Sequence, residues 1–275
     1  MNMPSTPPTA ADPFGTHLRH WRLRRRLSQL DLAHEAQVST RHLSYVETGR
    51  AEPSREMVLR LAERLEVPLR ERNALLVAAG YAPMYRQRSL DDPALAAARR
   101  AVDLVLKGHE PYPALAVDRH WNLVAHNALV PMLMAGAAPE LLKPPINVLR
   151  LSLHPGGLAP RIANLAQWRA HLLERLQQQI AATGDAVLVT LHEELAAYPA
   201  PAVSHDVAAI GGDLGNVVVP FQLVTDGGVM SFISTTTIFG TPVDVTLQEL
   251  AVESFFPADA GTAAALSALA AATPA

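Results

Sequence analysis

Apolar residues recur at every third or fourth position from residue 13 to residue 82, which predicts five short helices. Serines stand where the second, third and fourth helices begin, and a serine hydroxyl there accepts a hydrogen bond from a free backbone N–H group. These predicted N-caps are Ser28, Ser39 and Ser54. Gly80 ends the fifth helix. The pattern therefore predicts an all-α domain over residues 13–82.

The pattern changes after the fifth helix. Residues 83–93 combine two prolines with a polar stretch and are interpreted as a linker. A helix is predicted over residues 92–106. In residues 94–257 a strand pair around the turn Asp118–Asn122 follows it, further helices come next, and a hairpin with an Asp-Gly turn comes later. Residues 245–256 are predicted as a last strand. We therefore expect an α+β domain with strands at both ends of a helical insert.

The two ends of the chain have biased compositions. Residues 1–12 are rich in proline and threonine and are predicted to be a disordered N-terminus. Residues 258–275 are rich in alanine and are predicted to be a tail that frays. Between these ends, the 275-residue chain has room for two domains of ordinary size.

Composition narrows the class of protein. With 49% hydrophobic and 18% charged residues, the chain is expected to be soluble and globular. It has no cysteine, which excludes a disulfide framework and a thiolate metal site. Its first residues do not resemble a signal peptide, and no uncharged run of about 18 apolar residues follows. We expect a cytoplasmic protein that has no membrane partner.

The charge is divided unevenly along the chain. Residues 1–88 hold 14 arginines against 9 acidic residues, a net charge of +5, whereas the remainder holds 9 basic against 17 acidic residues, a net charge of −8. A positive first part on a negative remainder indicates a polyanionic partner for the first part alone. A solvated surface explains the same numbers, so charge by itself leaves nucleic-acid binding open.

The second and third helices have the spacing of a helix-turn-helix. Gln29 begins the second helix, the small residues Ala33 and Ala36 let the two helices cross closely, and Val38 fills the turn. Polar and forked side chains on the outer face of such a third helix can reach base edges in the major groove. The residues predicted on that face are Thr40, Arg41, Ser44 and Tyr45.

This stretch resembles the phage-repressor and XRE group of helix-turn-helix regulators over residues 14–80. The matching motifs are Leu27-Ser28-Gln29 with Leu32-Ala33, Glu47-x-Gly49-Arg50-x-x-Pro53-Ser54, Leu61-Ala62-x-x-Leu65 and Ala78-Ala79-Gly80-Tyr81. The resemblance implies a lambda-repressor-like fold that binds double-stranded DNA. By position it places seven residues at the DNA, namely Gln29, Ser39, Thr40, Arg41, Ser44, Tyr45 and Arg50. It also implies that Glu47 pairs inward with Arg22 and holds the third helix against the first.

Alternatives stay open for this region. Gln29 is also explained as a solvated helix start, and Arg41 contacts either a base or only phosphate. A helix-turn-helix also serves as a protein-binding module or as the antitoxin half of a toxin pair.

Residues 90–257 resemble the ligand-binding domain of MmyB-like regulators, which has a PAS-like fold. The matching motifs are Pro113-Ala-Leu-Ala-Val-Asp-x-x-Trp121-Asn-Leu-Val-Ala-His-Asn127, Asn147-Val-Leu-Arg150-Leu-x-x-His154-Pro155 and Asn164-x-x-x-Trp168. His126 departs from the family, which usually has an aromatic residue there. The resemblance implies a small apolar ligand, such as a fatty acid, in an interior pocket. Since such regulators reach two DNA half-sites, we also expect a homodimer.

Seven residues are candidates for the ligand pocket: Trp121, His126, Asn127, Asn147, Arg150, His154 and Trp168. Five of them also have a plainer explanation. The tryptophans also suit an ordinary core, and a buried Asn127 more economically caps the following helix. Arg150 is expected to meet a ligand carboxylate or an acidic neighbour such as Glu193 or Glu194, and His154 also suits the end of a helix.

Enzyme motifs are weak. The chain has no HExxH, and His154-Pro-Gly-Gly157 lacks the Lys-Ser or Lys-Thr of a phosphate loop. We expect no catalytic activity, no metal and no cofactor. The sequence predicts a sequence-specific DNA-binding transcriptional regulator that senses a small apolar ligand. The alternative is a helix-turn-helix adaptor or antitoxin-type interaction module without a small-molecule ligand, and a hydrolase with a fused DNA-binding head comes third.

Overall fold

The computed structural model describes residues 12–199, 218–240, 242 and 244–272. The chain forms two compact units, one built mainly from residues before Ser89 and one mainly from Ser89 onward. The division falls inside residues 83–93, which the sequence suggests as a linker. The expected disordered N-terminus lies outside the described residues except for Asp12.

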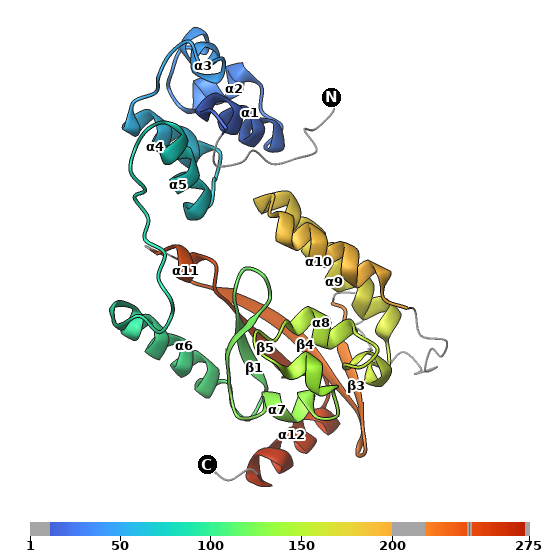
Figure 1. The fold of residues 1–275 in the computed structure, drawn as a ribbon. Helices are drawn as coiled ribbons and strands as arrows, with labels where there is room; N and C mark the ends of the chain where they lie inside the picture. Colours follow the sequence, from blue (N-terminus) through green and yellow to red (C-terminus); the bar gives the residue numbers. More distant parts are fainter. Residues whose placement is uncertain (1–11, 200–217, 241, 243, 273–275) are drawn as a thin grey trace. The chain divides into compact units, whose positions relative to one another are not determined.

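The first unit is the predicted five-helix domain (Figure 1). Its helices are α1 (Phe14–Arg24), α2 (Gln29–Glu35), α3 (Thr40–Glu47), α4 (Arg55–Arg64) and α5 (Leu69–Ala78). Ser28, Ser39 and Ser54 each accept a hydrogen bond from the backbone N–H three residues later, as their positions predict. The Asp31 carboxylate in turn accepts a hydrogen bond from the backbone N–H of Ser28 at 3.0 Å, which completes a capping box.

A single apolar core joins the five helices. Its fully buried side chains come from every helix and include Leu18, Leu32, Leu43, Leu61 and Leu76. The first and third helices approach most closely at Gly15, where an added Cβ atom would lie 2.3 Å from the carbonyl oxygen of Glu47. Only glycine fits there, so the sequence itself permits the close packing of α1 on the end of α3.

The second unit is built on a five-stranded antiparallel sheet with the order β2-β1-β5-β4-β3. The strands are β1 (Ala114–Val117), β2 (Leu123–His126), β3 (Phe221–Thr225), β4 (Gly228–Ile238) and β5 (Ala251–Pro257). The first strand pairs with the last, with Ala116 opposite Val252. The expected α+β, PAS-like architecture, with strands at both ends of a helical insert, is therefore confirmed.

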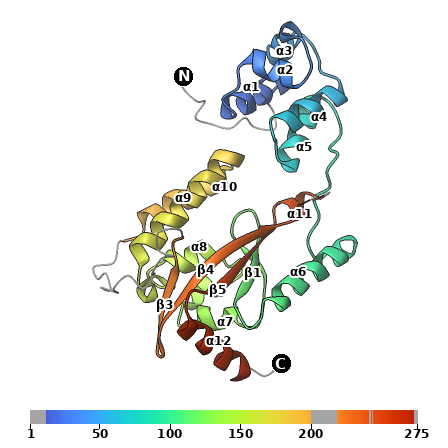
Figure 2. The same ribbon diagram turned by 180° about the vertical axis from the view of Figure 1, so that it is seen from behind.

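Helices cover both faces of this sheet (Figures 1 and 2). The α-helices that follow α5 along the chain are α6 (Ala96–Gly108), α7 (Val130–Met134), α8 (Val148–Leu153), α9 (Leu165–Thr183), α10 (Ala186–Ala197), α11 (Val245–Gln248) and α12 (Ala260–Ala272). Of these, α11 belongs to the first unit. Short 3₁₀ turns cover Pro93–Leu95, Pro139–Leu142 and Ala159–Arg161. Successive residues of β1 point to opposite faces: Ala116 packs with Val102 and Leu106 of α6, and Leu115 joins the larger core with α7 to α10.

Two expectations for the C-terminal end are wrong. Residues 245–256 are not one strand, because α11 occupies their first part and β5 begins only at Ala251. The alanine-rich tail does not fray over Ala260–Ala272, which form α12. The Asp259 carboxylate accepts a hydrogen bond from the Thr262 backbone N–H at 2.7 Å and starts this helix, and Leu266 is fully buried.

No helix in the described part of the chain has both the length and the apolar character that a bilayer crossing requires.

The packing of α12 predicts unequal costs for two leucines on the same helix. Leu266 is 0% exposed and Leu269 is 38% exposed. Leu266→Ala should lower the free energy of unfolding by about 2–5 kcal/mol because it leaves a cavity. Leu269→Ala, the matched control, should cost less than about 1 kcal/mol. Chemical denaturation of both variants measures the difference, and equal small losses would mean that α12 does not pack on the sheet.

Candidate DNA-binding helix and ligand cavity

The inner face of α3 fixes which of its side chains point outward. Leu43 and Val46 are buried in the core of the first unit. The four predicted DNA-facing side chains lie away from these two. Arg41 is exposed, and three are half-buried, namely Thr40, Ser44 and Tyr45. None of the side chains expected to face bases is packed inside the core.

Arg41 and Tyr45 lie one helical turn apart and contact each other. The Arg41 Nε–H donates to the Tyr45 hydroxyl at 3.1 Å, and the guanidinium carbon lies 5.4 Å from the centre of the tyrosine ring. The two terminal guanidinium nitrogens have no protein partner among the described residues. This leaves a forked pair of donors at the surface, the arrangement that bonds to the two acceptors of guanine.

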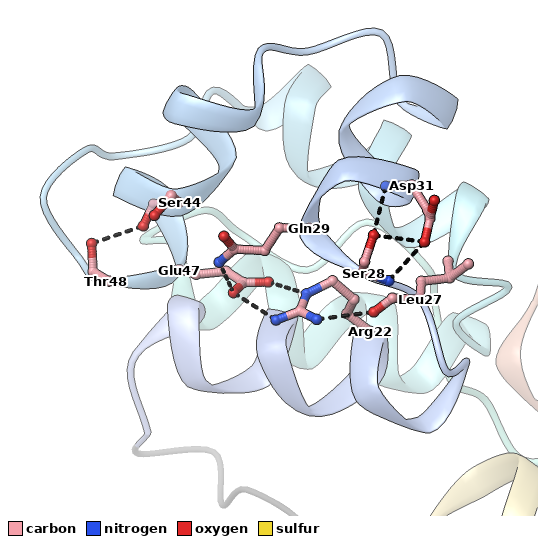
Figure 3. Close-up of polar contacts among 8 residues, drawn as sticks. All are labelled: Arg22, Leu27, Ser28, Gln29, Asp31, Ser44, Glu47 and Thr48. Atoms are coloured by element: carbon pink, nitrogen blue, oxygen red, sulfur yellow. Dashed lines mark hydrogen bonds and ion pairs between the residues drawn. The ribbon is translucent and has the colours of Figure 1, made fainter. Parts of the chain in front are cut away.

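A buried polar network holds α3 from behind (Figure 3). The Arg22 guanidinium on α1 donates to both carboxylate oxygens of Glu47, at 2.6 and 3.0 Å, and to the Leu27 carbonyl oxygen at 2.9 Å. The Gln29 amide donates to Glu47 Oε2 at 2.7 Å. The side chains of Arg22 and Glu47 are 9% and 3% exposed. The network therefore connects α1, α2 and α3 around an ion pair that is largely shielded from solvent.

Gln29 and Arg50, both expected at the DNA backbone, differ in their surroundings. Gln29 was expected at a phosphate, and here its amide belongs to the network with Glu47. Arg50 is exposed just beyond α3, and its backbone N–H bonds to the Tyr45 carbonyl oxygen at 2.8 Å. Gly49, with φ +71°, supplies the left-handed backbone that turns the chain there.

This network predicts a strong effect from a near-isosteric change. Glu47→Gln leaves the Arg22 charge buried without a counter-charge and should lower the free energy of unfolding by about 3–5 kcal/mol. Glu56→Gln is the matched control, since Glu56 pairs with Arg60 at 2.8 Å but its side chain is 82% exposed. The control should cost less than about 1 kcal/mol. Denaturant unfolding followed by circular dichroism decides, and a small loss in Glu47→Gln would show that the pair does not hold the domain.

The second unit contains a cavity of about 80 Å³ between the sheet and the helices that cover it. Its wall is mostly apolar and comes from all five strands and from α7, α8 and α9, together with the loops that carry Trp121 and Leu158. Apolar residues on this wall include Leu115, Trp121, Leu149, Trp168, Leu172 and Phe221. Of the seven residues expected at a ligand pocket, Trp121 and Trp168 lie here.

Two charged side chains that sequence reasoning missed also line the cavity. Arg175 of α9 donates to both carboxylate oxygens of Glu253 on β5, at 2.6 and 3.0 Å. The Arg175 guanidinium carbon lies 4.6 Å from the centre of the Trp121 ring. Two hydroxyls, of Ser152 and Ser234, complete the polar part of the wall.

The two asparagines expected as ligand anchors hold the backbone instead. Asn127 is buried, and its Oδ1 accepts hydrogen bonds from the Ala114 and Leu129 N–H groups, while its Nδ2 donates to two carbonyl oxygens. The plainer explanation, that Asn127 caps the following helix, is wrong, because the N-cap of α7 is Leu129 and no side chain caps that helix. Asn147 is the N-cap of α8, because its Oδ1 accepts from the Arg150 N–H at 3.1 Å. Neither residue lines the cavity.

The remaining three candidates also lie away from the cavity. Arg150 pairs with Glu194 of α10, at 2.7 and 2.8 Å, which is one of the acidic neighbours expected for it. Its guanidinium holds the pKa of the Glu194 carboxyl below its usual value. His154 is the C-cap of α8, and its Nδ1 accepts from the Gly156 N–H at 2.9 Å. His126 is exposed at the end of β2.

A sequence signal for the missed pair does exist. Arg175 follows Trp168 and Leu172 at spacings of seven and three residues, so it is a charged residue on an apolar helix stripe. Glu253 alternates with Phe255, two residues on, in a strand that is otherwise apolar or small at its inward positions. A charge at each of these positions requires a buried partner.

Comparison with known families supports both units. The chain matches the MmyB-like transcription regulator ligand binding domain over residues 98–269 and a helix-turn-helix domain over residues 13–75. No curated protein matches the chain. The first match contains the cavity and extends into α12, and the second contains α3 and the network behind it. The expected helix-turn-helix domain and the expected MmyB-like ligand-binding domain are therefore confirmed.

Proposed function

The chain belongs to the MmyB-like transcription regulators, in which a helix-turn-helix DNA-binding domain accompanies a ligand-binding domain, and on that premise we propose that it binds a specific operator through α3 and senses a small apolar ligand in its cavity. The observation that carries the DNA part is the exposed polar face of α3, which the buried Arg22–Glu47 pair supports from behind. Side chains that read bases must be held in register by contacts that do not move.

We assign contacts with DNA bases and contacts with DNA phosphates to different residues. We assign base contacts to Thr40 and Arg41 in the first turn of α3 and to Ser44 one turn later. Hydrogen bonds to phosphates position such a helix on the duplex without reading its sequence. We assign these supporting contacts to Gln29, Ser39, Tyr45 and Arg50. For Gln29, this requires that the second N–H of its amide reach a phosphate while the first keeps its hydrogen bond to Glu47.

The proposed regulator acts as a homodimer. One helix-turn-helix reads only a short half-site, and two copies related by a two-fold axis read two half-sites about one turn of DNA apart, roughly 34–36 Å. The oligomeric state stays a prediction until the mass of the protein is measured in solution.

The cavity supports a small apolar ligand, such as a fatty acid, more than a large polar one. Its volume of about 80 Å³ is roughly half of the ~150 Å³ that holds benzene in an engineered apolar cavity. It therefore accommodates a compact molecule or one end of an acyl chain. Such a ligand changes transcription only if it binds the DNA-competent and incompetent states with different affinities.

A rival function uses the same domains without a ligand. In an adaptor or antitoxin-type module, the second unit would bind a protein. The cavity wall, apolar with a few polar groups, favours the sensor because that combination is typical of small-molecule sites. The cytoplasmic location and the lack of catalytic activity expected from the sequence stay predictions.

The role of Arg41 is tested on a duplex selected from a random pool. Arg41→Ala should weaken binding to that duplex by about 1–3 kcal/mol, roughly 5- to 150-fold, and change binding to a scrambled duplex far less. Arg100→Ala removes the same charge from an exposed position of α6 and should leave both affinities unchanged. Affinities measured by fluorescence anisotropy at one salt concentration decide. An equal loss on both duplexes would make Arg41 a phosphate contact, and no loss on either would remove it from the interface.

Ligand sensing is tested on the protein as purified. Solvent extraction followed by mass spectrometry should release a small apolar molecule in a stoichiometric amount, because a closed apolar site retains such ligands. A stoichiometric protein partner with no extracted molecule would instead support the adaptor or antitoxin function.

A further inference from the structure

We propose that α11, the short helix between β4 and β5, transmits the ligand state of the cavity to the DNA-binding unit, and that Gln248 is the residue that positions it there. The inference rests on the proposed sensing function and adds to it a route by which DNA binding is regulated. It comes from the composition of the first unit, which includes residues 241–248 although the strands on either side of them belong to the second unit.

The first step is that hydrogen bonds hold α11 against the segment that follows α5. The Val245 N–H donates to the Arg86 carbonyl oxygen at 2.9 Å, and the Thr246 hydroxyl donates to the Arg88 carbonyl oxygen at 2.5 Å. Arg86 and Asp244 also form a parallel β-bridge. Val245 and Asp244 are 1% and 3% exposed. Moving α11 away would therefore expose buried groups and break their hydrogen bonds.

The second step is that Gln248 caps α5. The first N–H groups of a helix have no acceptor within the helix. In α2, α3 and α4 a serine at the N-cap supplies the acceptor, whereas the N-cap of α5 is Pro68, whose side chain cannot accept a hydrogen bond. The Leu69 N–H instead donates to Gln248 Oε1 at 2.7 Å, across 179 positions of the sequence. The start of α5 is therefore completed by α11.

The third step is the covalent connection of α11 to the cavity wall. β4 pairs with β5 as far as Ile238 opposite Ala251, and α11 lies between these two residues in the chain. The wall residues Ser234, Glu253 and Phe255 are on these two strands. A ligand that shifts either strand therefore acts directly on the connection between them.

The fourth step leads from α5 to the recognition helix inside the first unit. α5 contributes Leu75 and Leu76 to the apolar core and contacts α1. Arg22 of α1 in turn holds Glu47 of α3. A change at the start of α5 thus reaches α3 through packed and hydrogen-bonded groups. Operator affinity changes along this route if the ligand favours one position of α11 over another.

The test measures the operator affinity of the full chain with and without saturating dodecanoate. In wild type the two dissociation constants should differ by about 5- to 150-fold. Gln248→Ala removes the cap of α5 and touches neither the cavity nor α3, so this ratio should fall below about twofold while the affinity for dodecanoate stays unchanged. Gln87→Ala is the matched control, because Gln87 accepts a hydrogen bond from Arg70 of α5 at 2.7 Å without involving α11, and it should keep the ratio of wild type.

Hydrogen exchange gives a second readout that separates coupling from a purely structural role. Dodecanoate should change the protection of the first N–H groups of α5 in wild type. In Gln248→Ala their protection should be low with and without dodecanoate. A cap that only stabilises α5 would show the same protection in wild type whether or not dodecanoate is bound, and that result would overturn the inference.

The remaining outcomes distinguish this inference from the sensing function. A folded Gln248→Ala variant that keeps the wild-type ratio overturns the role of α11 and leaves ligand sensing standing. If that variant does not fold, Thr246→Val replaces it, because it removes only the hydroxyl that donates to Arg88, and the same two results decide. If wild type does not bind dodecanoate, or binds it without any change in operator affinity, the sensing of a fatty acid fails and this inference fails with it.

Discussion

The buried pair of Arg22 and Glu47 is the interaction on which the DNA-binding half depends. It joins the first and third helices, and Gln29 adds the second through Glu47. Apolar packing alone tolerates small shifts between helices, whereas a fork of hydrogen bonds inside a core has one favourable geometry. The close contact at Gly15 acts at the same place, since it brings α1 against the end of α3. The outer face of α3 is positioned by these contacts, and base reading requires such positioning.

The second unit uses a similar pair for a different purpose. Arg175 and Glu253 lie at the edge of an apolar cavity, where each charge requires the other. In the first unit an ion pair orients a helix, and in the second it supplies the charged groups of the described cavity wall. The wider core that surrounds the cavity, from Leu115 to Leu266, keeps its shape.

Local signals explain what could be predicted from the sequence. Serine caps and the helical period identify α1 to α5, because each signal lies within one or two turns of the element it defines. The inner role of Glu47 followed from the family resemblance. The tail was misjudged because α12 is mostly alanine, and the buried face of this helix is marked only by Thr262 and Leu266. Arg175 and Glu253 were missed because they are 78 residues apart in the sequence. They come together only when α9 packs on the sheet that contains β5. The motif residues Asn127 and Asn147 are prominent in the sequence because the backbone needs them, which no local pattern distinguishes from ligand binding.

We propose that the ligand and DNA shift the same equilibrium between the DNA-competent and incompetent states of the protein. The affinity of the protein for the selected operator tests this proposal most directly. The operator is titrated with the full chain, with and without a saturating concentration of the ligand extracted from the purified protein. Coupled sites predict that the dissociation constant changes by about 5- to 150-fold, and that the operator changes the affinity for the ligand by the same factor. An operator affinity that stays the same while the ligand is bound would contradict the account.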